Sequence, residues 1–117
     1  MLPKQNRLYL KTEFGRIQKR GRIIQGKLFS LLFLNQRLLT ITQQPRFAFI
    51  VSKKIDKRAI KRNRVKRLLS EAVRLFLPQI RQGVEGVFLA KKEILGKEFA
   101  EIKNETEGIF KKANLFK

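Results

Sequence analysis

The central segment of this chain is strongly basic and also patterned like one face of a helix, and this combination constrains the fold more than any other feature. Residues 51–74 contain ten Lys or Arg residues and only two acidic residues, Asp56 and Glu71. Within and just after this segment, apolar residues follow the i, i+3, i+4, i+7, i+8, i+11 spacing of an amphipathic helix, namely Val65, Leu68, Leu69, Ala72, Val73 and Phe76. The pattern predicts a helix that buries one side in a core and holds positive charge in fixed positions beside it.

The whole chain carries the same charge imbalance. It has 28 Lys and Arg residues against 9 Asp and Glu residues, which gives a formal charge of +19 on 117 residues. The electric field of so large a positive charge repels other copies of the protein and attracts a polyanion. Like charges four residues apart, such as Arg62 and Lys66, destabilise an isolated helix by roughly 0.2–0.5 kcal/mol per pair. Because the segment keeps such pairs, its charge indicates a partner; a solvated surface that binds nothing is the alternative.

RNA is the partner that suits these side chains best. Arg offers paired donors to phosphate, and Asn63 can read a base edge or a 2′-hydroxyl. We therefore predict that the basic segment binds RNA. The predicted RNA-binding residues are Lys53, Lys54, Lys57, Arg58, Lys61, Arg62, Asn63, Arg64, Lys66, Arg67 and Arg74.

The chain lacks the groups that most enzymes and metal sites use. It contains no Cys and no His, and Asp56 is its only Asp. Neither a disulfide nor a thiolate metal site can form, and the usual general base is missing. A two-carboxylate nuclease centre is disfavoured as well. We predict that the protein itself has no catalytic residue, no metal ligand and no tightly bound cofactor.

No targeting or membrane segment is expected. Residues 1–8 lack the apolar run of a signal peptide. The longest apolar stretch, residues 28–34, is interrupted by Ser30 and is too short to cross a bilayer. The sequence therefore predicts a cytoplasmic protein with no membrane partner.

Local patterns in the first half predict one helix followed by three strands. The helix is predicted over residues 11–20, with Thr12 as its N-cap and Gly21 as its stop. Apolar runs predict strands over residues 22–24, 27–34 and 46–52, with a polar turn region at 35–45. The second and third strands are expected to pair antiparallel through that turn region.

The second half is predicted to contain the basic helix, one strand and a last helix. The basic helix is expected over residues 58–77, ended by Pro78. Gly83 and Gly86 are expected to flank a turn. The remaining strand and helix are predicted at residues 87–90 and 97–113. The order α-β-β-β-α-β-α predicts one α+β domain over residues 1–117, a sandwich in which helices pack on a small sheet.

The chain passes from an extended strand ending in Ser52-Lys53-Lys54, through a short loop, into a helix that opens with Arg62-Asn63-Arg64 and Lys66-Arg67. This arrangement resembles the signature of the bacterial ribonuclease P protein subunit. Earlier in the chain, the likeness includes Asn6-Arg7-Leu8, Phe14 and Gly21, and it extends over most of the sequence.

The resemblance implies a protein cofactor of a ribozyme. In this family the catalytic RNA uses Mg²⁺ to remove the 5′ leader of precursor tRNA by endonucleolytic cleavage, and the protein supplies no catalytic group. The Arg-Asn-Arg helix binds the catalytic RNA, and a cleft between the first helix and the sheet binds the leader. The implied leader-binding residues of this chain are Phe14, Arg16 and Gln18. A left-handed βαβ crossover through the basic helix is also implied, against the general preference for right-handed crossovers.

Two positions depart from the family pattern. Gln18 stands where a second cleft aromatic is often found, and each base–aromatic stack contributes roughly 1–3 kcal/mol. Stacking on leader bases is therefore expected to be weaker. Ser70 stands where the basic helix often carries another Arg, so one phosphate contact is expected to be missing.

Two other functions fit part of the sequence. A small ribosomal or ribosome-associated RNA-binding protein can be equally basic, but the spacing from Lys53-Lys54 to Arg62-Asn63-Arg64 argues against it. A self-sufficient nuclease would need groups that this chain lacks. Co-purifying RNA distinguishes the ribosomal hypothesis from the ribonuclease P hypothesis, since it is ribosomal RNA in the first case and a catalytic RNA in the second. Cleavage of precursor tRNA by the protein free of RNA would support the nuclease hypothesis.

Overall fold

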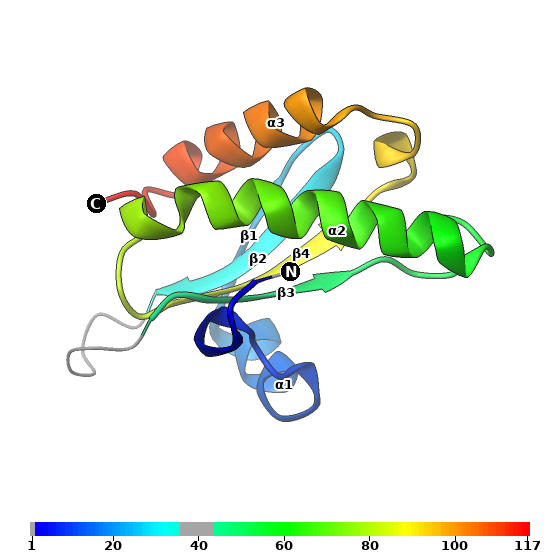
Figure 1. Cartoon of the computed structure of the whole chain (residues 1–117). Helices are drawn as coiled ribbons and strands as arrows, with labels where there is room; N and C mark the ends of the chain where they lie inside the picture. Colours follow the sequence, from blue (N-terminus) through cyan, green and yellow to red (C-terminus); the bar gives the residue numbers. More distant parts are fainter. Residues whose placement is uncertain (1, 36–43) are drawn as a thin grey trace.

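The computed structural model describes residues 2–35 and 44–117 (Figure 1). The described residues form the helices α1 (Leu10–Arg20), α2 (Ala59–Phe76) and α3 (Phe99–Lys112). Their strands are β1 (Arg22–Gln25), β2 (Phe29–Asn35), β3 (Arg46–Ile50) and β4 (Val84–Ala90). Three 3-10 turns lie at Lys4–Asn6, Leu77–Gln79 and Lys92–Ile94. This confirms the predicted order; residues 36–43 of the predicted turn region lie outside the described residues.

The strands pair differently from the sequence-based expectation. The sheet order is β1-β2-β4-β3, in which β2 pairs antiparallel with β4 and β3 pairs parallel with β4. The predicted antiparallel pairing of residues 27–34 with 46–52 is therefore wrong, because β4 lies between these strands. A parallel pair needs a crossover connection, and α2 provides it between β3 and β4. The βαβ crossover through the basic helix is confirmed; its left-handed sense stays a prediction.

Helices cover both faces of the sheet. Figure 1 shows α1 on one face and α2 with α3 on the other. Side chains of β2 alternate accordingly, so that Phe29 and Leu31 join the core under α2 and α3 while Leu32 joins the core under α1. The α1 core also contains Ile17, which is fully buried. Since the central strands are buried on both sides, their near-continuous apolar sequence is explained.

Gly86 lies within β4 and does not flank a turn as predicted. A Cβ atom at this position would lie 3.0 Å from Leu31 Cδ1 and 3.0 Å from Phe47 Cδ1. Phe88, two residues on, packs against Phe47 with ring centroids 5.7 Å apart. The glycine therefore lets the aromatic core close tightly over the middle of the sheet.

The ends of α1 are set by backbone contacts. Tyr9 is its N-cap, and the Thr12 hydroxyl donates to the Tyr9 carbonyl from inside the first turn, so the prediction of Thr12 as N-cap is wrong. The helix does end at Gly21 as predicted. Gly21 has extended backbone angles rather than left-handed ones, and its N–H donates to the Ile17 carbonyl at 2.7 Å. A Cβ there would lie 2.7 Å from the Phe33 carbonyl oxygen. The glycine therefore allows the end of α1 to lie close to the backbone of β2.

The basic helix runs to Phe76, one residue before the predicted end, and a 3-10 turn containing Pro78 follows it. The buried face of α2 includes Val65, Leu69 and Val73, as the apolar spacing predicted. In the part of the chain that the structure describes, none of the helices combines the length and apolar character needed to span a membrane.

Candidate RNA-binding site

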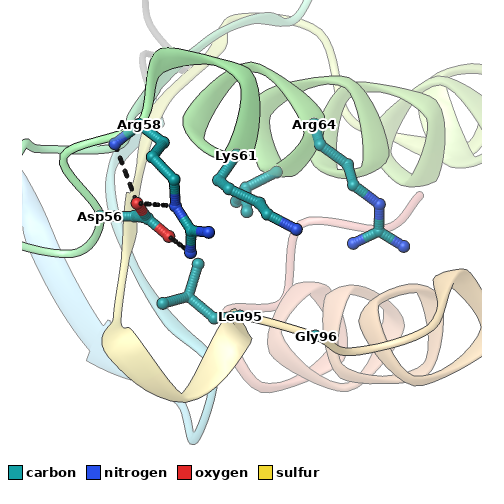
Figure 2. A pocket seen from close by; sticks show the side chains of 7 residues that line it. Asp56, Arg58, Lys61, Arg64, Leu95 and Gly96 are labelled. Atoms are coloured by element: carbon teal, nitrogen blue, oxygen red, sulfur yellow. Dashed lines mark hydrogen bonds and ion pairs between the residues drawn. The ribbon is translucent and has the colours of Figure 1, made fainter.

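The loop that enters α2 is organised by Asp56 and Arg58. The Arg58 guanidinium donates to both carboxylate oxygens of Asp56, from Nε to Oδ1 at 3.1 Å and from Nη2 to Oδ2 at 2.9 Å (Figure 2). The Arg58 backbone N–H also donates to Oδ1, at 2.9 Å. These side-chain and backbone hydrogen bonds lower the pKa of Asp56 from its usual 3.8 to about 2. Arg58 is thus already paired with the only Asp of the chain.

Arg62 contacts the same loop from one turn further along α2. Its Nη1 donates to the Asp56 carbonyl at 3.0 Å and to the Lys57 carbonyl at 2.7 Å. These bonds fix the direction in which the chain enters the helix. Two predicted RNA-binding residues, Arg58 and Arg62, therefore also have structural contacts within the protein.

One flank of α2 faces the turn that precedes α3. Arg58, Lys61 and Arg64 line a cavity of about 560 Å³ there, together with Leu95 and Gly96. We call this space the α2–α3 cavity. Figure 2 shows the Lys61 and Arg64 side chains extending from α2 toward the segment with Leu95 and Gly96. Three cations thus lie within two turns of the helix, with Asp56 as the acidic residue among them.

The other flank of α2 faces β3 and the N-terminal segment. We call the space between them the α2–β3 groove, a cavity of about 590 Å³. On the helix side it is lined by Asn63, Lys66, Arg67, Ser70 and Glu71. Its opposite side and floor include Leu2, Arg7, Leu8, Ala48 and Phe49. The sequence predicted one basic stripe beside the buried face, whereas the structure divides those residues between two flanks with Val65 and Leu69 buried on the helix face between them.

The remaining predicted RNA-binding residues are exposed but are not part of these two cavities. Lys53, Lys54 and Lys57 lie in the loop between β3 and α2, before the helix begins. Arg74 lies near the end of α2, where its Nη1 is 3.7 Å from Glu71 Oε1. The loop residues extend the positive surface at the start of α2, while Arg74 is separated from them by most of the helix length.

The predicted leader-binding residues lie on α1, on the other face of the sheet. Phe14 is half-buried and packs against the core under α1, as do Ile50 and Leu89. Gln18 is exposed. Neither the α2–α3 cavity nor the α2–β3 groove is lined by Phe14, Arg16 or Gln18. The structure therefore separates the two predicted RNA-binding regions onto opposite faces of the sheet (Figure 1).

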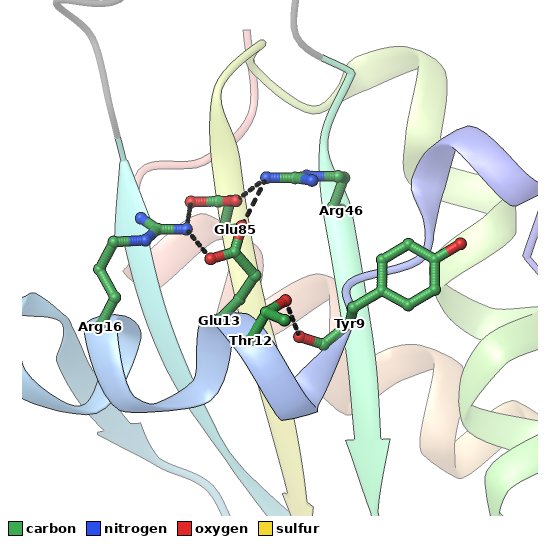
Figure 3. A network of polar contacts seen from close by, with 6 residues as sticks. All are labelled: Tyr9, Thr12, Glu13, Arg16, Arg46 and Glu85. Carbon is green, nitrogen blue, oxygen red and sulfur yellow. Dashed lines mark hydrogen bonds and ion pairs between the residues drawn. The ribbon is translucent and has the colours of Figure 1, made fainter.

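Arg16 takes part in an ionic cluster between α1 and the sheet, which we call the Glu85 cluster (Figure 3). Its Nη2 lies 2.8 Å from Glu85 Oε1 and 3.3 Å from Glu13 Oε2. Arg46 on β3 pairs with the second oxygen of Glu85 and lies 3.7 Å from Glu13. Glu85 is only 2% exposed, and its hydrogen bond and charge raise the pKa of Arg16.

The Glu85 cluster was not found from the sequence. Glu85 sits in an apolar strand pattern, and its partners come from α1 and β3, far away along the chain. A buried carboxylate almost always has a partner, so a Glu inside an apolar run was the signal that could have revealed the cluster. Tyr9, at 60% exposure, is another missed residue, an aromatic side chain left on the surface at the start of α1.

Residues 2–35 and 44–117 contain no group of three or more Asp or Glu side chains placed to hold a metal ion. The residues that line the two cavities offer cations, the Asn63 amide and partly buried apolar surface. Such a combination binds phosphates and bases.

Comparisons with known proteins agree with this geometry. The family description Ribonuclease P matches residues 2–114 of the chain. The ribonuclease P protein component of Caldanaerobacter subterraneus subsp. tengcongensis is 34% identical over 116 residues, covering 99% of this chain and 96% of that protein. The same component from Clostridium kluyveri is 34% identical over 114 residues, covering 95% of this chain and 96% of that protein.

The fold is similar to that of a solved relative. The Staphylococcus aureus RNase P protein, in the form of a mutant with defective mRNA degradation activity, superimposes with a TM-score of 0.84 at 25% identity. That match covers 97% of this chain and 92% of the Staphylococcus aureus chain. The family match, the identity along the whole length and the fold agree, and the chain belongs to the ribonuclease P protein family.

Proposed function

We propose that this protein is the RNA-binding cofactor of a ribonuclease P holoenzyme, in which a catalytic RNA cleaves precursor tRNA and releases its mature 5′ end. The single observation that carries the proposal is the placement of cations on both flanks of α2. Lys61 and Arg64 lie on one flank, and Lys66 and Arg67 lie on the other. Because the helix is held by its buried face, these charges are presented at fixed positions to a structured RNA.

The mechanism is electrostatic. Two folded RNAs that approach each other are two polyanions, and a protein of charge +19 between them reduces their repulsion. Each phosphate that a Lys or Arg neutralises releases condensed counterions, which favours binding in a salt-dependent way. The protein thereby lowers the concentration of Mg²⁺ that the RNA needs, while the RNA and its Mg²⁺ carry out the cleavage.

The 5′ leader of precursor tRNA is proposed to bind on the α1 face. Phe14 is half-buried, so part of its ring is available for stacking on a base. Gln18 is exposed and offers hydrogen bonds in place of a second aromatic ring. Arg16 is held by Glu85, so we assign it the task of fixing α1 on the sheet while its exposed part faces the leader.

The proposed partners are the catalytic RNA and precursor tRNA, and the proposed location is the cytoplasm, without a membrane partner. The tight Asp56–Arg58 pair makes Arg58 the weakest candidate among the cations of α2, since phosphate must compete with a carboxylate for it. Lys61, Arg64, Lys66 and Arg67 are the strongest candidates.

Cleavage of precursor tRNA at low Mg²⁺ tests the proposal. A bacterial ribonuclease P RNA is assayed with and without the full-length protein, and the protein is also assayed alone. We expect cleavage at the mature 5′ end only when both are present. If the protein left the Mg²⁺ dependence and the substrate affinity of the RNA unchanged, the cofactor function would be refuted and a ribosomal role would become the leading alternative. Cleavage by protein free of RNA would indicate a self-sufficient nuclease.

A further inference from the structure

The floor of the α2–β3 groove is apolar and includes an aromatic ring, which suits a flat, apolar ligand. Phe49 lines it, is only partly buried, and stacks on Phe88 with ring centroids 5.4 Å apart and an interplanar angle of 21°. Leu2 and Leu8, both buried, contribute further apolar surface. The cavity of about 590 Å³ has the size of many small-ligand sites.

The N-terminal segment that closes the groove is held in place by hydrogen bonds to backbone carbonyls. The Leu8 N–H donates to the Phe47 carbonyl at 3.0 Å, and Asn6 Nδ2 donates to the Pro45 carbonyl at 2.8 Å. Arg7 Nε donates to the Leu2 carbonyl at 2.8 Å. The groove wall opposite α2 is therefore a fixed part of the fold, added along the edge of β3.

The α2 wall combines positive charge with one amide. Lys66 and Arg67 are exposed, and within the described residues no hydrogen-bond partner engages the exposed Asn63 amide. Ser70 is buried, and its hydroxyl donates to the Arg67 carbonyl at 3.1 Å. Because this small side chain bonds to its own helix, the wall stays open between Arg67 and Glu71.

We propose that the α2–β3 groove receives one unpaired base of the catalytic RNA. Phe49 and the leucines contact the base, Asn63 hydrogen-bonds to its edge, and Lys66 and Arg67 contact the flanking phosphates. Aromatic contact combined with hydrogen bonding to the base edge is the general way in which proteins hold splayed RNA bases. The Glu71 carboxylate in the wall repels a phosphate from that part of the groove but accepts hydrogen bonds from a base amino group.

The inference rests on the proposed function, because it takes the catalytic RNA as the partner of α2. The cations at the rim belong to the same helix as Lys61 and Arg64, so one RNA can contact both flanks. The leader, in contrast, is assigned to α1 on the other face of the sheet. We therefore commit to a base of the catalytic RNA and treat a leader base as an outcome of the test.

The first experiment compares Asn63→Ala with Asn104→Ala, a matched change of an exposed amide on α3. Affinity for ribonuclease P RNA is measured over a series of salt concentrations. We expect Asn63→Ala to weaken binding about tenfold, within the range for loss of one base contact, while the dependence on salt stays unchanged because no charge is removed. Asn104→Ala is expected to match the wild type. An unchanged affinity for Asn63→Ala would overturn the inference, and a changed salt dependence would indicate a phosphate contact instead.

The second experiment fills the groove with Ser70→Leu. Chemical probing of the unpaired bases of ribonuclease P RNA is done with the wild type and with each variant. We expect one base that the wild-type protein protects and that loses its protection with both Ser70→Leu and Asn63→Ala. Urea unfolding establishes that Ser70→Leu is folded; if it is not, Asn63→Ala decides the matter alone.

The outcomes separate this inference from the proposed function. If wild-type protein does not bind ribonuclease P RNA, the proposed function fails first. If the wild type binds but protection is the same with Asn63→Ala, only the groove assignment fails. Protection that moves to a leader base of precursor tRNA overturns the choice of the catalytic RNA.

Discussion

Arginine side chains occur in two contrasting settings in this molecule, along the flanks of α2 and in the Glu85 cluster under α1. In the Glu85 cluster, Arg16 and Arg46 meet the carboxylates of Glu13 and Glu85, so the four groups are neutral together. Along α2, cations such as Lys61 and Arg67 project from the helix without a comparable set of acids. The same residue type thus fixes the fold in one place and is available to a polyanion in the other.

The difference lies in the surroundings of each guanidinium. A buried carboxylate such as Glu85 must have its charge compensated, and it holds its arginines firmly. Exposed cations on a helix repel each other weakly and have no buried carboxylate to hold them. They therefore bind a phosphate readily. Arg58 and Arg62 are intermediate, since Asp56 and two loop carbonyls already engage them.

The largest expected effect concerns the stability of the Glu85 cluster. Glu85→Gln removes the charge that two arginines share, and we expect the free energy of unfolding to fall by about 2–3 kcal/mol. Urea unfolding measures it, with Glu107→Gln as the control. Glu107 lies on the exposed surface of α3 with Lys111 Nζ 3.8 Å away, and its loss should cost at most about 0.5 kcal/mol. If the two variants lost equal free energy of unfolding, the distinction between the buried Glu85 cluster and exposed ion pairs would be contradicted.

The next effect concerns RNA affinity. The double variant Lys61→Ala/Arg64→Ala should weaken binding to ribonuclease P RNA by about tenfold and reduce the salt slope by about two, roughly one for each lost phosphate contact. Its free energy of unfolding should stay within about 0.5 kcal/mol of the wild type. The matched control is Lys111→Ala/Lys112→Ala at the end of α3, for which affinity should change far less. A uniform loss in both double variants would show that net charge alone determines binding.

A smaller effect in the opposite direction is expected at Asp56. Asp56→Asn removes the carboxylate that competes with phosphate for Arg58. Affinity for RNA should rise by about threefold, since an exposed ion pair is weak and its loss frees Arg58 for phosphate. Filter binding at constant salt measures the change, and an affinity below that of the wild type would mean that the Asp56–Arg58 pair shapes the RNA-binding surface.

The smallest expected effect is a pH dependence from the same pair. The pKa of Asp56 in the folded protein, about 2, lies below its usual 3.8. The carboxylate therefore stabilises the folded state fully above its usual pKa, and this contribution is lost as the pH falls from there through about 2. Urea unfolding of wild type and Asp56→Asn between pH 4 and pH 2 should show a steeper loss for the wild type. If the free energy of unfolding fell equally with pH in both proteins, the lowered pKa of Asp56 would be contradicted.

Local sequence patterns predicted the elements of this fold well but not the contacts between them. The apolar spacing from Val65 to Phe76 and the stop expected at Pro78 predicted a helix over residues 58–77, within one residue of α2 at each end, because one helix face is a local property. Strand pairing depends on long-range contacts, so the insertion of β4 between β2 and β3 could not be read from neighbouring residues. The same limit hid the packing role of Gly86.

The candidate site shows a similar division. The sequence identified the cations of α2, because their density is visible in a short window. It did not separate them into two flanks, since that division depends on β3, the N-terminal segment and the turn before α3. Arg16 was predicted as a leader contact, and its pairing with Glu85 required knowledge of how α1 lies on the sheet.

The measurement that tests the central claim most directly is the affinity of the wild-type protein for ribonuclease P RNA as a function of salt concentration. If the cations on the two flanks of α2 contact phosphates, log Kd should rise linearly and steeply with log salt, with a slope of about 0.9 for each phosphate contacted. We expect a slope of at least about 3.6, the sum for one phosphate contact by each of Lys61, Arg64, Lys66 and Arg67. An affinity that stays flat from low to moderate salt would contradict the account.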